Sequence, residues 1–162
     1  MNDPTIYAQL ADVEKRLKAL ERQEGGDISG AWTIGFAGST IAGTFTYSTQ
    51  VANYVRSGNV VFVYGFVGIS AVGVAATGNL RITGLPFTSA NVGNGFQALA
   101  IAQYNTLNLT AGCIDLGARV TPNGLYADLM ENFDNAPAGN LPGGALAAGS
   151  LVILGGSYIA EA

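Results

Sequence analysis

The spacing of apolar residues along this chain changes once, at the adjacent glycines Gly25-Gly26. Before them, apolar residues recur every three or four positions, which is the period of a helix. After them, short β-branched and aromatic runs are separated by Gly, Asn, Pro and Ser. Glycine readily adopts the left-handed conformation that ends helices. The sequence therefore predicts a helix in residues 1–24, a Gly-rich linker in residues 25–30 and a separate domain in residues 31–162.

The helical segment carries a narrow apolar seam. Pro4 suits the first turn of a helix, and the seam residues follow at spacings of four, three, four and three. This is the heptad spacing of a coiled coil, whereas a helix packed on a globular core has a wider apolar stripe. Leu10 and Leu17 occupy heptad position a, and the β-branched residues Ile6 and Val13 occupy position d. This combination disfavours a two-stranded coiled coil. The seam consists of Ile6, Leu10, Val13, Leu17 and Leu20.

The segment from Arg16 to Glu21 resembles the trimer-specifying pattern Arg-h-x-x-h-Glu, in which h is an apolar residue. In that pattern the arginine of one helix pairs with the glutamate of its neighbour. We therefore expect the helix to form a homotrimeric stalk. The alternative is an amphipathic helix that packs on the domain of residues 31–162 of its own chain, which we call the head. Three heptads give about 30 Å of helix, which is marginal on its own. The head is thus expected to supply most of the stability of the trimer.

The two regions differ sharply in charge. Residues 1–27 hold ten charged side chains, whereas residues 28–162 hold only eight. A domain so poor in charge would be poorly soluble if every face met water, so it is expected to bury surface against copies of itself. The chain has no basic patch for nucleic acid. It also has no run of about 18 apolar residues that would insert into a membrane.

Residues beyond the linker predict an all-β domain, because short strands with turn signals between them are typical of sandwiches and barrels. Ser57-Gly58-Asn59 predicts a tight hairpin. Long loops are expected at 84–94, 104–112 and 132–149. The predicted strands are 31–36, 43–48, 51–57, 59–69, 78–83, 95–103, 113–120, 125–131 and 150–159.

One predicted strand is apolar on both faces. Alternation places Phe62 and Tyr64 on one face, with Val60 and Phe66, and places Val61, Val63 and Val67 on the other. A strand that is apolar on both faces is buried on both. In a small sandwich, the second face is expected to lie against another subunit, with overlying loops as the alternative.

The sequence offers little for catalysis. It has no histidine, which excludes Ser-His-Asp and Cys-His mechanisms and histidine metal sites. Cys113 is the only cysteine, so no intrachain disulfide forms. Asp128 and Glu131 would point to opposite faces of a strand, so a hydrolase with paired carboxylates is only a minor alternative. A calcium site around Asp134 is likewise a minor alternative. We expect no enzyme activity, no cofactor and no metal.

Glycan recognition needs aromatic rings that stack on sugar faces and polar groups that bond to hydroxyls. The later segments of the chain hold several aromatic residues beside amides and a carboxylate. Because charges are few, binding is expected to depend little on salt. The candidate ligand-binding residues are Tyr104, Asn105, Tyr126, Asn132, Phe133 and Asp134.

Four segments resemble those of short phage tail-fibre and head-fibre tip proteins. They are Gly30-Ala31-Trp32-Thr33, the hairpin from Tyr54 to Phe62, the Gly-Leu-Pro-Phe turn within 80–89, and the final strand from Ser150 to Tyr158.

The resemblance to this family implies a homotrimer of jelly-roll-like β-sandwich heads on the virion, in a fibre or tail. Its head would attach to a host-cell surface, where a glycan is the expected ligand. Its N-terminus would contact another virion structural protein. The alternatives are a decoration protein that binds no host and a bacterial trimeric fibre-tip adhesin at the cell surface.

Overall fold

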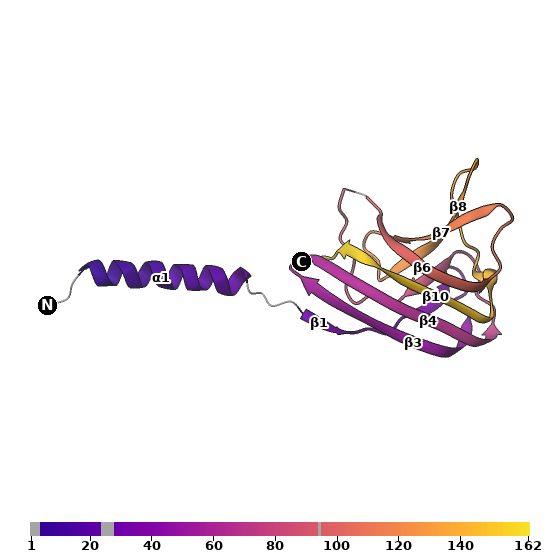
Figure 1. Ribbon diagram of the computed structural model, residues 1–162, viewed down its shortest axis with the longest axis horizontal. Coiled ribbons are helices and arrows are strands. Elements are labelled where there is room, and N and C mark those ends of the chain that lie inside the picture. The colour runs from indigo at the N-terminus through magenta and orange to yellow at the C-terminus, as the bar shows by residue number, and fades with distance from the viewer. Residues whose placement is uncertain (1–3, 24–27, 94) are drawn as a thin grey trace.

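The computed structural model describes residues 4–23, 28–93 and 95–162, without the side chains of residues 4–6 and 18–23. One helix precedes a domain built almost entirely of strands (Figure 1). The elements are α1 (Pro4–Gln23), β1 (Ile28–Ala31), β2 (Gly35–Gly38), β3 (Thr44–Ser57), β4 (Val60–Val74), β5 (Leu80–Thr83), β6 (Gln97–Leu107), β7 (Cys113–Val120), β8 (Tyr126–Phe133), β9 (Gly139–Asn140), the 3₁₀ turn η1 (Gly143–Ala145) and β10 (Leu146–Ile159).

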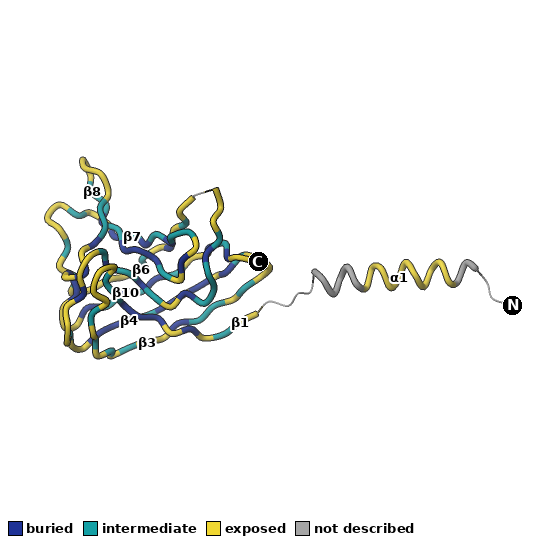
Figure 2. Tube along the Cα trace, turned by 180° about the vertical axis from the view of Figure 1, so that it is seen from behind, coloured by how far each residue is buried: buried dark blue, intermediate teal, exposed yellow. Residues whose placement is uncertain are grey.

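Helix α1 begins at Pro4, as predicted. Residues 7–17 are all exposed, and the seam residues Leu10, Val13 and Leu17 are each more than half exposed. These side chains are thus not covered by the head of the same chain (Figure 2). Among the described residues, no helix is long and apolar enough to cross a membrane. Three side chains of the predicted trimer contact lie outside the described residues: Ile6, Leu20 and Glu21.

The strands confirm the all-β prediction. The described residues form one antiparallel sheet with the order β1-β3-β4-β10-β6-β7-β8-β5-β2, and β9 pairs with β8. In Figure 1, β3, β4, β10 and β6 lie side by side, while β7 and β8 turn away from them. The sheet folds over on itself and encloses the core between its two layers (Figure 2).

Side chains of β3 close the sandwich where the two ends of the sheet meet. The amide nitrogen of Phe36, on β2, donates to the hydroxyl of Tyr47 at 2.9 Å. The side-chain amide of Gln50 donates to the carbonyl of Ile34 at 2.7 Å. These bonds satisfy backbone groups at an edge that has no further strand beside it.

The core explains the alternation in the sequence. Most inward-facing side chains from both layers are apolar and almost fully buried, while their neighbours along each strand face outward. The largest of the buried side chains are Tyr158, Ile34, Ile69, Leu80, Ile82, Leu99, Leu116, Leu129, Leu141 and Leu154.

Several predicted boundaries need correction. The predicted strands 43–48 and 51–57 form the single strand β3, with irregular register where they join. The predicted loop 104–112 begins inside β6, because Tyr104 and Asn105 pair with β10. The predicted loop 132–149 contains the end of β8, β9, η1 and the start of β10. Pairing with distant strands extends these elements beyond what local composition indicates.

Strand β4 has one buried and one open face. The hairpin prediction is confirmed, because Ser57 pairs with Val60 around a two-residue turn. Val61 is fully buried in the core. Phe62 is 52% exposed and Tyr64 is 58% exposed, so overlying loops do not cover the second apolar face.

Candidate functional site

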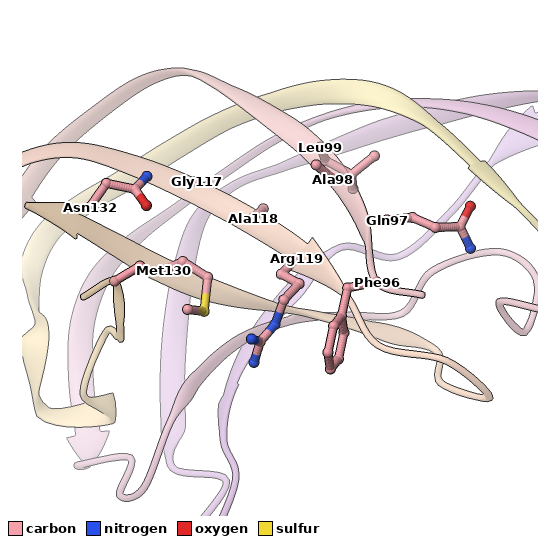
Figure 3. Close-up of a pocket in the computed structure, with 10 residues that line it drawn as sticks. Phe96, Gln97, Ala98, Leu99, Gly117, Ala118, Arg119, Met130 and Asn132 are labelled. Carbon is pink, nitrogen blue, oxygen red and sulfur yellow. The ribbon is translucent and has the colours of Figure 1, made fainter. Parts of the chain in front are cut away.

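A cavity of about 440 Å³, which we call the outer cavity, lies against the outward side of β6, β7 and β8. Ala118 and Val120 of β7 are buried in the core. The alternate residues Gly117 and Arg119 therefore face outward. Figure 3 shows side chains from all three strands around the cavity. Its lining includes Phe96, Gln97, Gly117, Arg119, Met130 and Asn132.

Small residues make room for the outer cavity. Ala98 and Gly117 leave the sheet surface low between the larger side chains (Figure 3). A Cβ atom added at Gly117 would meet only the side-chain nitrogen of Asn132, at 3.6 Å, which is an ordinary contact. The backbone therefore does not require glycine at this position. The effect of the missing side chain is to leave space for the outer cavity.

A buried carboxylate holds the charged residues beside the outer cavity. Asp128 on β8 is only 5% exposed. It accepts hydrogen bonds from Arg81 Nε at 2.9 Å and from Thr121 Oγ1 at 3.1 Å. Arg119 Nη2 lies 3.8 Å from the same carboxylate. Two arginines therefore share one aspartate, and the group carries a net charge of +1.

Both arginines also stack on aromatic rings. The guanidinium carbon of Arg81 lies 4.0 Å from the ring centre of Tyr126, and that of Arg119 lies 4.3 Å from the ring centre of Phe96. Such cation–π contacts hold flat groups in fixed orientations. Phe96 is nevertheless 56% exposed, so much of its ring stays accessible. We call the line of residues Tyr126, Arg81, Asp128, Arg119 and Phe96 the arginine row.

The hydrogen-bond donors of the Arg119 guanidinium are only partly used within the protein. Its Nη2 donates a long hydrogen bond of 3.4 Å to Asn140 Oδ1. Its Nε is buried and has no partner within the described part of the chain. A buried donor without a partner is unfavourable, so the protein's own groups leave this guanidinium incompletely satisfied.

The predicted ligand-binding residues are only partly brought together. Asn132 lines the outer cavity, and Tyr126 lies at the far end of the arginine row. Phe133 and Asp134 follow at the end of β8, where Asn135 donates to Asp134 at 3.2 Å.

The other two predicted residues lie elsewhere. Tyr104 and Asn105 lie on β6 beyond the segment that pairs with β7, and neither lines the outer cavity. Sequence reasoning missed Phe96 and Arg119, which are separated by 23 positions. The available signal was an arginine on a strand whose alternate residues are apolar.

The prediction that Asp128 and Glu131 point to opposite faces of their strand is confirmed. Asp128 faces outward to the arginines, whereas Glu131 is 2% exposed and accepts a hydrogen bond from Thr110 Oγ1 at 2.8 Å. Within the described residues, no group of three or more His, Cys, Asp or Glu side chains could hold a metal ion. The arrangement thus provides a concave surface with one charged group and offers no facing pair of carboxylates.

Comparison with solved structures identifies a fold. The chain is similar to the crystal structure of the Dettilon tailspike protein, with a TM-score of 0.67 and 20% sequence identity. The two share a fold. The match covers 83% of this chain but only 24% of the tailspike chain. No protein-family model and no curated protein matches this chain.

Proposed function

We propose that this protein is a phage tail-associated receptor-binding protein whose β domain binds a host-surface glycan in the outer cavity. The observation that carries the proposal is the cavity of about 440 Å³ beside the half-exposed ring of Phe96. Ligand sites are typically concave, largely apolar and furnished with a few polar groups. The fold shared with part of a tailspike supports a location in the virion tail.

The chemistry of the lining suits a sugar. The ring of Phe96 and the side chain of Met130 offer apolar surface to a pyranose face. Asn132 offers an amide to hydroxyl groups. Gln97 is held by two hydrogen bonds with the backbone of Ile159, which keep that wall of the cavity in place. The site is shallow, so several copies on one particle would raise its effective affinity.

We propose a homotrimer as the source of those copies. The heptad seam supports this, and so does an exposed surface on the other layer of the sheet, which we call the apolar face. The register places Val55 opposite Phe62, and both side chains point outward with Tyr64 and Val51. All four are more than 40% exposed. Such a surface fits a second copy of the same chain, because subunit contacts bury apolar side chains.

The charges support the same contact. Arg56 pairs in register with the buried Val61, so it points away from the apolar face. The other charged residues of the head that the structure describes lie on β5, β7, β8, the segment after β8 or the C-terminus. The apolar face therefore presents no charge that would have to be desolvated between subunits.

The test of the glycan site uses the full chain and intact host cells or a glycan array. Phe96→Ala removes the stacking surface, and Gly117→Val fills the outer cavity with a residue that suits a strand. Both variants are expected to bind at least about tenfold more weakly. Tyr104→Ala, 39% exposed and outside the cavity, is the matched control and should bind normally. Normal binding by both cavity variants would refute this site.

A further inference from the structure

The arginine row carries more positive charge than its carboxylate neutralises. Arg81 takes the short contact with Asp128 at 2.9 Å, which leaves Arg119 with the longer one at 3.8 Å. Arg119 is also the arginine that lines the outer cavity. Its charge is therefore the less compensated of the two and is directed toward the cavity.

Nearby acidic groups do not cancel this charge. Glu131 lies on the inward face of β8 and is bound by Thr110. Asp115 lies on the outward side of β7, but four residues from Arg119, which corresponds to about 13 Å along a strand. That separation exceeds the screening length of about 8 Å at physiological salt.

The geometry of Arg119 also favours a particular partner. Its Nε is buried without an acceptor among the described residues, and its Nη2 has only long contacts, at 3.4 Å with Asn140 and 3.8 Å with Asp128. The side chain of Arg119 nevertheless stays 33% exposed beside the cavity, and a guanidinium can offer two parallel N–H donors that one carboxylate accepts at once. Stacking on Phe96 at 4.3 Å fixes the plane of this guanidinium beside the aromatic ring proposed to bind the sugar.

We propose that the saccharide bound in the outer cavity is acidic, and that the carboxylate of a uronic or similar sugar pairs with Arg119. This inference rests on the proposed function and adds the chemical class of its ligand. It replaces the expectation, drawn from the low charge of the head, that binding depends little on salt. A carboxylate held at Arg119 makes binding weaken as salt rises.

The experiment is an NMR titration of the full chain in which the side-chain Nε–H signal of Arg119 is followed. Sodium glucuronate and galacturonate are the probes, glucose and galactose are their neutral counterparts, and inorganic phosphate is the simple anion. We expect a saturable shift of the Arg119 signal, together with shifts of Phe96 and Asn132, for the uronates. Their affinity should fall several-fold between about 50 mM and 500 mM NaCl.

Two variants test the pairing of the carboxylate with Arg119. Arg119→Gln removes the charge and Arg119→Lys keeps it without the paired donors, so both are expected to weaken uronate binding by about tenfold. Arg56→Gln removes the same charge from β3, four strands away in the sheet, and should leave binding unchanged. Thermal unfolding shows whether each variant is folded.

The remaining outcomes separate the two proposals. Neutral sugars that shift Phe96 and Asn132 as strongly as the uronates would overturn the acidic ligand and leave the glycan site standing. Phosphate that shifts Arg119 as strongly as the uronates, without the signals of Phe96 and Asn132, would show a simple anion site and overturn the inference. No shift with any sugar would overturn both the inference and the proposed function.

Discussion

The proposed contact between subunits can be tested by removing the two aromatic side chains of the apolar face. In the single chain, Phe62 is 52% exposed and Tyr64 is 58% exposed. A fully exposed aromatic side chain presents about 200 Å², so each retains about 100 Å² that a partner can cover. At about 25 cal/mol per Å², covering one of them contributes about 2.5 kcal/mol.

Replacing both with serine should therefore remove about 4–5 kcal/mol of association free energy per subunit. The fold itself should change little, because half of each side chain already faces water. Light scattering after gel filtration is expected to give three times the chain mass of 16.6 kDa for the unaltered protein and 16.6 kDa for the double variant at micromolar concentration. Deleting residues 1–24 should leave the trimer weaker but present, because the head contributes most of the contact.

Ile114→Ser is the matched control for this experiment. Ile114 is 65% exposed on β7, away from the apolar face. Its replacement removes an exposed apolar side chain comparable with one of the two aromatic residues, and the variant is expected to remain trimeric. A double variant that remains trimeric would show that another surface holds the subunits. An unaltered protein that runs as a monomer at micromolar concentration would refute the homotrimer itself.

Three further predictions concern stability, measured by urea denaturation. Burial raises the pKa of Tyr158 from 10.0 to about 12, so the unfolded chain ionises first as the pH rises. The free energy of unfolding should fall by about 2–3 kcal/mol between about pH 10 and pH 12, and Tyr158→Phe should lack this part of the fall. Gly84→Ala should cost about 3 kcal/mol or more, because φ is +85° and the new Cβ would lie 2.0 Å from the carbonyl oxygen of Thr33. Gly58→Ala, with φ +57° and open space, should cost only about 1 kcal/mol. Asp128→Asn should cost about 3 kcal/mol, because two arginines then face each other without their carboxylate, and an unchanged urea midpoint would contradict that role.

The two surfaces proposed for assembly and for glycan binding lie on different parts of the head. The apolar face lies on β3 and β4, while the outer cavity lies on the outward side of β6, β7 and β8. These surfaces belong to different parts of one curled sheet (Figure 1). A trimer assembled through the first surface therefore leaves the second accessible in every subunit. This is the arrangement that multivalent attachment requires.

Features that depend on neighbouring residues could be predicted from the sequence. The heptad seam predicts helix α1, Gly58-Asn59 predicts the hairpin, and alternation predicts that Val61 and Phe62 face opposite ways. Alternation also predicts the opposite faces of Asp128 and Glu131. Each of these properties follows from the period of a helix or strand, which a short segment expresses by itself.

The candidate site depends on pairing between strands that lie far apart in the sequence, which no short segment can reveal. Arg81 meets Asp128 across 47 positions, and Arg119 meets the same carboxylate because β7 pairs with β8 in one particular register. A shift of one residue in that register would turn Arg119 into the core and remove the outer cavity. Composition indicated a head almost without charge, and only the tertiary structure placed two of its three arginines around one aspartate. The physical reason is that register is set by the burial of both layers at once, which is a property of the whole sheet.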